Sequence, residues 1–217
     1  MFDTEKKRQP KTDIKYSLSL TDEQKAAKQK ILESTVVFLV GEAGTSKTFT
    51  ATSVALDMIF KGLKSKIVIT RPTVSTEDIG FLPGTFEEKM EPWLVPIRDN
   101  MRKFYNNPAK LKKMEEDGII EIVSMSHFRG RTFQDSICIL DESQNLSEGQ
   151  LKMAIGRLGK GSIMIFCGDI DQIDLKQPHT SAIHSINRLS NSPHVSVIEL
   201  TENHRHPAVH DLLELLK

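Results

Sequence analysis

The sequence has little cysteine and no excess of charge of either sign. Its 217 residues include two cysteines, Cys138 and Cys167, and both fall within apolar runs typical of buried strands. We therefore expect reduced, small hydrophobic side chains rather than a disulfide or a metal site. Lysine and arginine together number 29, as do aspartate and glutamate, so the formal net charge is zero. A neutral chain offers no global field to a polyanion, and any nucleic-acid surface must be a local patch.

The chain also lacks long hydrophobic segments. No apolar run approaches the roughly 20 residues that span a bilayer, and the N-terminus is charged where a signal peptide would be apolar. These absences predict a cytoplasmic protein. Residues 1–15 are polar and rich in lysine, which predicts a flexible arm, and the length of residues 16–217 predicts a single domain.

A regular alternation of apolar strands and helices is what the sequence does contain. Continuous apolar strands that alternate with helices are typical of an α/β fold whose parallel sheet is covered on both faces. Strands are expected at 35–40, 66–70, 119–124, 136–140, 163–167 and 195–200, and helices at about 21–33, after the loop at 41–48 to about 60, and at 150–157, 181–188 and 207–216. Between 71 and 118 five prolines predict an irregular insertion of short helical pieces.

The most informative segment joins the first expected strand to a glycine-containing loop. It reads Gly41-Glu42-Ala43-Gly44-Thr45-Ser46-Lys47-Thr48. Such a loop between a strand and a helix is typical of a P-loop, whose backbone N–H groups surround the phosphates of a nucleoside triphosphate. Lys47 is expected to reach the β- and γ-phosphates, and the Thr48 hydroxyl to bind Mg²⁺. Ser46 stands where the motif has glycine, and we expect it to tune nucleotide affinity rather than abolish it.

A second motif supplies carboxylates. The apolar run at 136–140 ends in Asp141 and Glu142. In P-loop proteins the first acid holds Mg²⁺, which assigns that role to Asp141, and Glu142 is placed to polarise an attacking water. Acids after a strand are common, but their occurrence downstream of a P-loop predicts ATP hydrolysis.

Polar residues follow two later strands. Asp169 and Gln172 come after the strand at 163–167, at the edge of the sheet where ligands of open α/β folds bind. We expect them beside Asp141, sensing the γ-phosphate, and an aspartate-rich turn without a binding role is the alternative. Arg205 also follows a strand and could bring its charge to the γ-phosphate, and a surface arginine near a helix start is the alternative there.

The order of these motifs resembles the first motor domain of superfamily 1 helicases, and more closely the PhoH family of phosphate-starvation ATPases. The residues that carry the closer match are TRP at 70–72, GFLPG at 80–84, RGRT at 129–132, LDESQN at 140–145, RLG at 157–159 and GD at 168–169. The match covers about residues 20–210. The resemblance implies a P-loop NTPase with a RecA-like sheet that uses ATP and Mg²⁺.

The helicase resemblance also implies roles outside the phosphate loop. A glutamine ahead of the P-loop recognises adenine in such helicases, and Gln24 matches that position. Gln24 is also the third residue of a capping box that starts at Thr21, so a structural role is the alternative. Arg71, Thr73 and Ser75 match a helicase segment that contacts the backbone of the single strand.

Superfamily 1 helicases enclose ATP between two motor domains, but this chain has length for one. The missing positive charge must therefore come from Arg205 or from a neighbouring subunit, for which Arg129, Arg131 and Arg157 are the candidates. A solvated turn is the alternative for the first two of these. Head-to-tail contacts that close give rings, and the resemblance favours a homo-oligomeric ring, most simply a hexamer.

A nucleic-acid surface within the insertion is a weaker prediction. Trp93, Phe104 and Tyr105 lie among basic residues, as in platforms for single strands. A packed amphipathic face with solvated charges fits the same pattern. The sequence thus predicts an ATPase coupled to binding or unwinding of single-stranded RNA or DNA, and an ATP-gated assembly or regulatory switch without translocation is the alternative.

Overall fold

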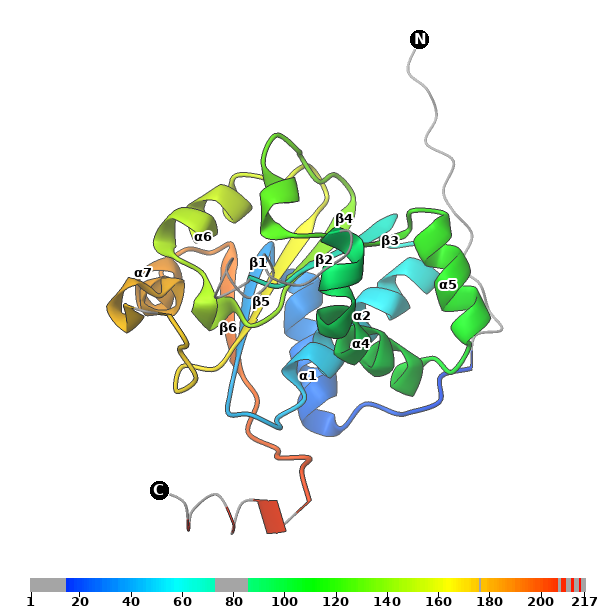
Figure 1. The fold of residues 1–217 in the computed structure, drawn as a ribbon, viewed down its shortest axis with the longest axis horizontal. Helices are drawn as coiled ribbons and strands as arrows, with labels where there is room; N and C mark the ends of the chain where they lie inside the picture. The colour runs from blue at the N-terminus through cyan, green and yellow to red at the C-terminus, as the bar shows by residue number, and fades with distance from the viewer. Residues whose placement is uncertain are drawn as a thin grey trace.

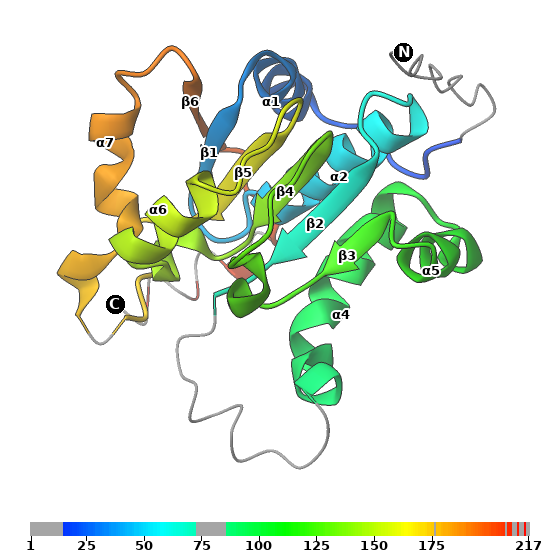
Figure 2. The ribbon, with the colours of Figure 1, turned by 90° about the horizontal axis from the view of Figure 1, so that it is seen from above.

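One parallel sheet organises the chain. The computed structural model describes residues 15–72, 86–175, 177–206, 208, 209, 212 and 215, and gives the backbone alone for 86–93. Its strands are β1 (Val36–Val40), β2 (Lys66–Thr70), β3 (Ile120–Ile122), β4 (Ser136–Leu140), β5 (Ile163–Gly168) and β6 (Val195–Glu199). They lie in the order β3-β2-β4-β5-β1-β6, and every pairing is parallel (Figure 2). The predicted α/β fold is confirmed.

Helices cover both faces of the sheet (Figure 1). One face carries α1 (Asp22–Glu33), α2 (Lys47–Phe60), α4 (Phe86–Phe104) and α5 (Pro108–Glu116), and the other carries α6 (Glu148–Ile155), α7 (Ile186–Leu189) and the 3-10 turns η1 (Met125–Phe128), η2 (Ser143–Asn145) and η4 (Ala182–Ser185). A further 3-10 turn, η3 (Pro178–Thr180), precedes η4. Along β1, Val37 and Leu39 face the first layer, and Phe38 faces the second. Because both faces are covered, β1 and β5 have no polar side chain, and β4 has none after Ser136.

The insertion is helical, as expected, but α4 is a single helix of 19 residues rather than a set of short pieces. It contains Pro92 and Pro96, each of which removes one backbone donor from the helix. Its buried side chains Ile97, Met101 and Phe104 are spaced by four and three residues and pack into the core. Burial of this stripe outweighs the cost of the prolines.

Three other elements differ from the expectation at their ends. The strand expected at 119–124 is the shorter β3, and the helix expected at 181–188 starts as the 3-10 turn η4 and continues as α7. Helix α6 begins two residues earlier than expected, because Ser147 caps it and Gln150 completes a capping box. The helix expected at 207–216 falls almost wholly outside the described residues, as does the arm expected at 1–15.

The segment before α1 is fastened to the first helical layer. The Tyr16 hydroxyl donates to Asp57 Oδ1 at 2.7 Å, and the Tyr16 ring stacks on Phe104 with centroids 4.4 Å apart. Asp57 is buried and also pairs with Lys28 at 2.7 Å and Lys61 at 2.9 Å. Within the described part of the chain, no helix combines the length and apolar composition needed to cross a bilayer.

Candidate functional site

The strand order brings the predicted motifs to one edge of the sheet. Strand β5 lies between β1 and β4, with Val40 opposite Gly168 and Leu140 opposite Phe166. The loop after β1, the acids after β4 and the aspartate after β5 therefore start from three neighbouring strand ends. This is the edge at which parallel α/β sheets bind ligands.

Lys47 lies folded over the loop that precedes it. Its Nζ donates to the carbonyl oxygens of Gly41 at 2.6 Å and Glu42 at 2.7 Å. Burial lowers the pKa of Lys47, and Asp169 is the strongest of the groups that oppose this shift. The Lys47 ammonium thus lies against the loop backbone, where the carboxylates of the site attract it electrostatically.

Three residues of the loop have positive φ angles that favour glycine: Gly41, with φ 150°, Gly44 and Ser46. Ser46, which caps α2, has φ 61° and ψ 31° in the left-handed region, which explains why the motif has glycine here. Gly44 has φ 94°, and a Cβ there would lie 2.7 Å from Arg205 Cγ and 2.8 Å from Asn203 Oδ1. The remaining loop residues are Ala43 and Thr45, whose hydroxyl donates to the Glu42 carbonyl at 2.8 Å. The sequence of the loop therefore matches its backbone at all positions except Ser46.

The segment that follows β6 rests on this loop. The His204 N–H donates to the Gly44 carbonyl at 3.0 Å, and Arg205 is exposed with its side chain against Gly44. The structure therefore brings Arg205 to the phosphate loop of its own chain.

Thr48 and Asp141 make the direct contact between the two principal motifs. Thr48 Oγ1 donates to Asp141 Oδ1 at 2.6 Å. Burial raises the pKa of Asp141, and the hydrogen bond from Thr48 opposes that shift. A hydroxyl beside a buried carboxylate fits Mg²⁺, which takes one or two protein oxygens and fills its octahedron with phosphate and water. The described residues contain no cluster of three His, Cys, Asp or Glu side chains, the pattern of an all-protein metal cage.

Glu142 is held by two side chains. Arg71 Nη2 lies 3.2 Å from its Oε1, and Gln144 Nε2 donates to its Oε2 at 2.7 Å. Glu142 itself has φ 52° and ψ 43°, a sparsely populated conformation of the kind that clusters at functional sites. The structure therefore places Arg71 beside the predicted catalytic carboxylate, a contact that the sequence did not indicate.

Asp169 and Gln172 have different environments. Asp169 is buried, its backbone N–H donates to Gln144 Oε1 at 3.2 Å, and its Oδ1 accepts from the Asp171 N–H at 3.0 Å. Gln172 is exposed in the following turn, where its N–H donates to the Asp169 carbonyl at 3.4 Å. Asp169 thus joins the site, whereas Gln172 lies at its surface. Gln144, which sequence reasoning did not select as a site residue, connects Asp169 to Glu142.

Gln24 forms the capping box of α1. Its Oε1 accepts from the Thr21 N–H at 3.1 Å, and its own N–H donates to Thr21 Oγ1 at 3.3 Å. The capping-box role, which was the alternative for Gln24, is therefore confirmed, and its recognition of adenine stays a prediction. The neighbouring Glu23 accepts from the Thr201 N–H at 2.7 Å and hydroxyl at 2.8 Å. The start of α1 thus holds the segment that rests on the phosphate loop.

The three arginines expected to act on a neighbouring subunit lie on other parts of the surface. Arg131 pairs with Glu121 of β3 and stacks over the Phe133 ring at 4.9 Å. Arg157 follows α6, and its buried Nε has no hydrogen-bond partner. Arg129 is exposed after η1. The contacts of Arg131 are thus made near the edge strand β3 rather than with the phosphate loop.

In the described part of the insertion, Phe104 and Tyr105 do not form the exposed aromatic platform that the sequence suggested. Phe104 is 4% exposed, and Tyr105 packs edge-on against Phe60 with centroids 4.8 Å apart. Both belong to the packed amphipathic face that was the alternative, because the stripe on α4 faces the core. Trp93 has no described side chain, and Thr73 and Ser75 lie outside the described residues.

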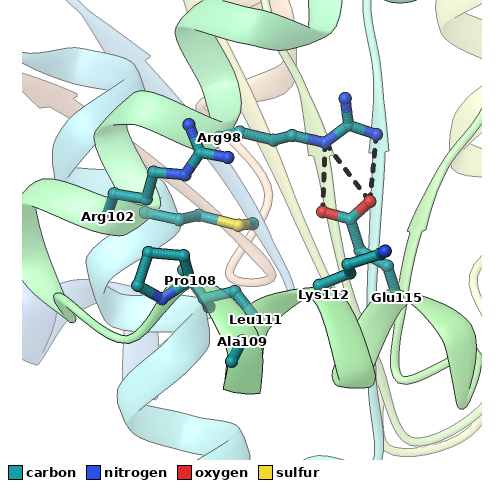
Figure 3. Close-up of a pocket in the computed structure, with 8 residues that line it drawn as sticks. Arg98, Arg102, Pro108, Ala109, Leu111, Lys112 and Glu115 are labelled. Atoms are coloured by element: carbon teal, nitrogen blue, oxygen red, sulfur yellow. Dashed lines mark hydrogen bonds and ion pairs between the residues drawn. The ribbon is translucent and has the colours of Figure 1, made fainter.

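Basic side chains of the insertion surround a pocket between α4 and α5 (Figure 3). Arg98 points across it to Glu115, with nitrogen–oxygen distances of 3.0 to 3.2 Å. Arg102 and Lys112 also line the pocket, together with the buried Met101 and Leu111. The Arg98–Glu115 pair ties the two helices together.

Sequence comparison places the chain among known proteins. The family described as PhoH-like protein matches residues 18–217. The PhoH-like protein of Bacillus subtilis (strain 168) is 41% identical over 183 residues, which are 82% of this chain and 57% of that protein. Protein PhoH of Escherichia coli (strain K12) is 38% identical over 149 residues, which are 67% of this chain and 42% of that protein. The chain therefore spans about half the length of these curated relatives.

Solved structures with a similar fold include two helicases. The Pif1 helicase from Candida albicans has a TM-score of 0.49 and 16% identity, over 92% of this chain and 43% of that one. Bacteroides Pif1 bound to ssDNA has a TM-score of 0.44 and 18% identity, over 91% of this chain and 46% of that one.

Proposed function

Since the chain belongs to the PhoH-like protein family, we propose that it is a P-loop ATPase that hydrolyses Mg²⁺-bound ATP to ADP and phosphate. The observation that carries the proposal is the contact of Thr48 with Asp141 at 2.6 Å, beside Lys47. A hydroxyl, a buried carboxylate and an ammonium at one edge of a parallel sheet are the groups that bind a nucleotide phosphate with its metal.

Each group has one task in this proposal. Lys47 would exchange the loop carbonyls for the β- and γ-phosphate oxygens, and Thr48 and Asp141 would hold Mg²⁺. A bound ion would neutralise charge on the phosphates. Glu142 orients a water and accepts its proton. The water oxygen bonds to the γ-phosphorus as the bond from that phosphorus to the β–γ bridging oxygen breaks, and ADP leaves with the electron pair.

Arg205 is proposed to supply positive charge to the γ-phosphate from within the chain, since its side chain lies against Gly44. Gln24 is proposed to contact adenine, as the helicase resemblance implies, and its neighbour Glu23 binds Thr201 of the segment that rests on the phosphate loop. We further propose a homo-oligomeric ring, in which Arg129, Arg131 or Arg157 reaches the nucleotide of a neighbouring subunit. Arg131 and Arg157 lie near Phe133, before β4 and β5 begin, whereas the phosphate loop follows the end of β1; this supports a role outside the site of their own chain.

Coupling to single-stranded RNA or DNA is proposed from Arg71. The helicase resemblance assigns Arg71, with Thr73 and Ser75, to the strand backbone, and in this fold Arg71 pairs with Glu142 at 3.2 Å. A polynucleotide phosphate that draws Arg71 away would change the surroundings of the hydrolytic carboxylate. Polynucleotide binding and hydrolysis would then be linked through one side chain. A regulatory switch without translocation is the competing function.

The test is phosphate release from Mg²⁺-ATP by the purified chain, with and without single-stranded RNA or DNA. Glu142→Gln serves as the hydrolysis-deficient control, because the amide keeps the shape of the side chain but accepts no proton. Release that polynucleotide stimulates and Glu142→Gln abolishes would support the coupled ATPase. Release indifferent to polynucleotide would favour the switch, and no release at all would overturn the proposal for this chain.

A further inference from the structure

Gln144 joins two strand ends of the site through one buried amide. It is 1% exposed and lies in η2, directly after the acids that follow β4. Its Nε2 donates to Glu142 Oε2 at 2.7 Å, and its Oε1 accepts from the Asp169 N–H at 3.2 Å. One side chain thus connects the predicted hydrolytic carboxylate after β4 to the backbone that follows β5.

The direction of the amide is fixed by its two partners. A carboxylate accepts hydrogen bonds and a backbone N–H donates them, so a reversed amide would face oxygen with oxygen and N–H with N–H. A carboxamide meets both demands at once, whereas a carboxylate, a hydroxyl or an apolar side chain of this length meets one or neither. The bridge therefore depends on the chemistry of glutamine and not on its volume alone.

The backbone of Gln144 is held separately from its side chain. The Ser181 hydroxyl donates to the Gln144 carbonyl. Gly168 lets this backbone pass close to β5, because a Cβ there would lie 2.7 Å from Ser143 Oγ and 3.2 Å from the Gln144 nitrogen. The loop is therefore positioned without help from the amide, which leaves the amide to orient Glu142.

We infer that Gln144 is a positioning residue. It orients the Glu142 carboxylate toward the attacking water and makes that orientation depend on the position of Asp169. Asp169 follows β5, the strand that lies between the one carrying the phosphate loop and the one carrying Glu142. The amide therefore makes the orientation of Glu142 depend on the backbone at the end of β5. This inference rests on the proposed hydrolysis of ATP.

The experiment compares two variants in the full chain. Gln144→Met keeps the volume without either hydrogen bond, and Gln144→Asn keeps the amide but is too short to span both partners. For both we expect kcat for phosphate release to fall by about 10- to 100-fold, because small misplacements of a catalytic group cost rates of this order. The Kd for Mg²⁺-ATP, measured with the same proteins, should change by less than about threefold, since the amide contacts neither phosphate nor metal.

Ser181→Ala is the matched control, because it removes a hydrogen bond to the same residue but leaves the amide in place. It should lower the thermal midpoint while kcat stays within about twofold of the unaltered chain, a difference too small for a lost transition-state contact. In the Glu142→Gln background, Gln144→Met should cause no further loss of kcat, because there is no carboxylate left to aim.

Two results would overturn the inference. One is a kcat within twofold of the unaltered chain in both Gln144 variants. The other is a loss of kcat that is equally large in Ser181→Ala, or that comes with an equal rise in the Kd for Mg²⁺-ATP. Either pattern would show that Gln144 has a structural role. If the unaltered chain releases no phosphate, the proposed function fails and the inference fails with it. Release by the unaltered chain with unaffected variants rejects the inference alone.

Discussion

The side chain of Arg205 lies directly against Gly44, so closely that a Cβ at Gly44 would come 2.7 Å from the Arg205 Cγ. The contact joins the segment after β6 to the loop after β1, two segments at neighbouring strand ends. A cationic side chain from the same chain thus covers the loop expected to bind phosphates, and the loop has no room for a side chain at position 44.

Gly44→Ala should therefore weaken Mg²⁺-ATP binding and lower the free energy of unfolding by about 1–3 kcal/mol, the usual cost of a strained backbone conformation. The alanine backbone would be strained at φ 94°, and the alanine Cβ would collide with the Arg205 side chain. Gly118→Ala is the control, because Gly118 has φ 66° with nothing within 4 Å of its added Cβ. It should lose stability but keep the ATP affinity. Equal ATP affinities in the two variants would contradict the contact.

Arg205→Ala should reduce kcat for phosphate release by on the order of 10²- to 10³-fold, the effect of losing one donor that stabilises transition-state charge. Arg188→Ala removes an equal charge, from an exposed pair with Glu148, and should leave kcat unchanged. A kcat that Arg205→Ala leaves intact would show that the charge comes from elsewhere.

An arginine acting in trans can be detected by mixing inactive subunits. Glu142→Gln chains keep their arginines, and Arg131→Ala chains keep their carboxylate, so mixed rings contain some complete sites. Phosphate release should reappear on mixing if Arg131 acts on its neighbour, and the same assay applies to Arg129 and Arg157. Mixtures that stay inactive for all three would reject the trans arrangement.

Arg71→Ala should reduce the ratio of polynucleotide-stimulated to basal phosphate release toward one. The reason is that Arg71 pairs with Glu142 at 3.2 Å and is the group proposed to meet the strand. Arg102→Ala removes the same charge from α4, where Arg102 pairs with Asp99, and should keep the ratio. A full stimulation ratio in Arg71→Ala would separate strand binding from Glu142.

Ser46→Gly should raise the free energy of unfolding by up to about 1 kcal/mol, because the left-handed conformation of Ser46 costs a residue with a Cβ about 1–2 kcal/mol and glycine loses part of that gain as entropy. Denaturation in urea measures the change. A variant less stable than the unaltered chain would show that Ser46 makes a compensating contact.

The stability of the chain should fall at acidic pH partly through Asp57. Burial raises the pKa of Asp57, but hydrogen bonds from Tyr16 and two lysines outweigh burial and hold that pKa below its ordinary value. A carboxyl with a lowered pKa stabilises the fold above its unfolded pKa of about 3.9 and loses that contribution as pH falls through the folded value. Urea denaturation from pH 6 to pH 3 should show a shallower pH dependence for Asp57→Asn. An identical slope would remove Asp57 from the acid response.

Local patterns were sufficient to predict the strands and the phosphate loop. The run of apolar residues before Gly41 and the acids after Leu140 are contiguous signals, and each strand end lies within one residue of its expected place except the end of β3, which comes two residues early. The continuous helix α4 was also encoded, in the spacing of Ile97, Met101 and Phe104, but the prolines hid it.

The contacts of Glu142 could not be predicted in this way. Arg71 reaches Glu142 because β2 is the neighbour of β4, and Gln144 reaches Asp169 because β5 is the neighbour on the other side. Strand order is a property of the whole fold, and no spacing within the sequence encodes it. The residues of the site could thus be predicted from their motifs, whereas the contacts between residues of different motifs could not.

The position of β1 also determines when the sheet can be completed during synthesis. Val36 pairs with Met164 on one side and with Val195 on the other, so the strand that carries the phosphate loop has both neighbours only after β5 and β6 have been made. Pairing between such distant segments folds slowly, because a long loop must close first. A ribosome-bound chain is therefore expected to gain nucleotide binding only after β6 has left the exit tunnel, because until then the apolar strand β1 lacks one of its two neighbours.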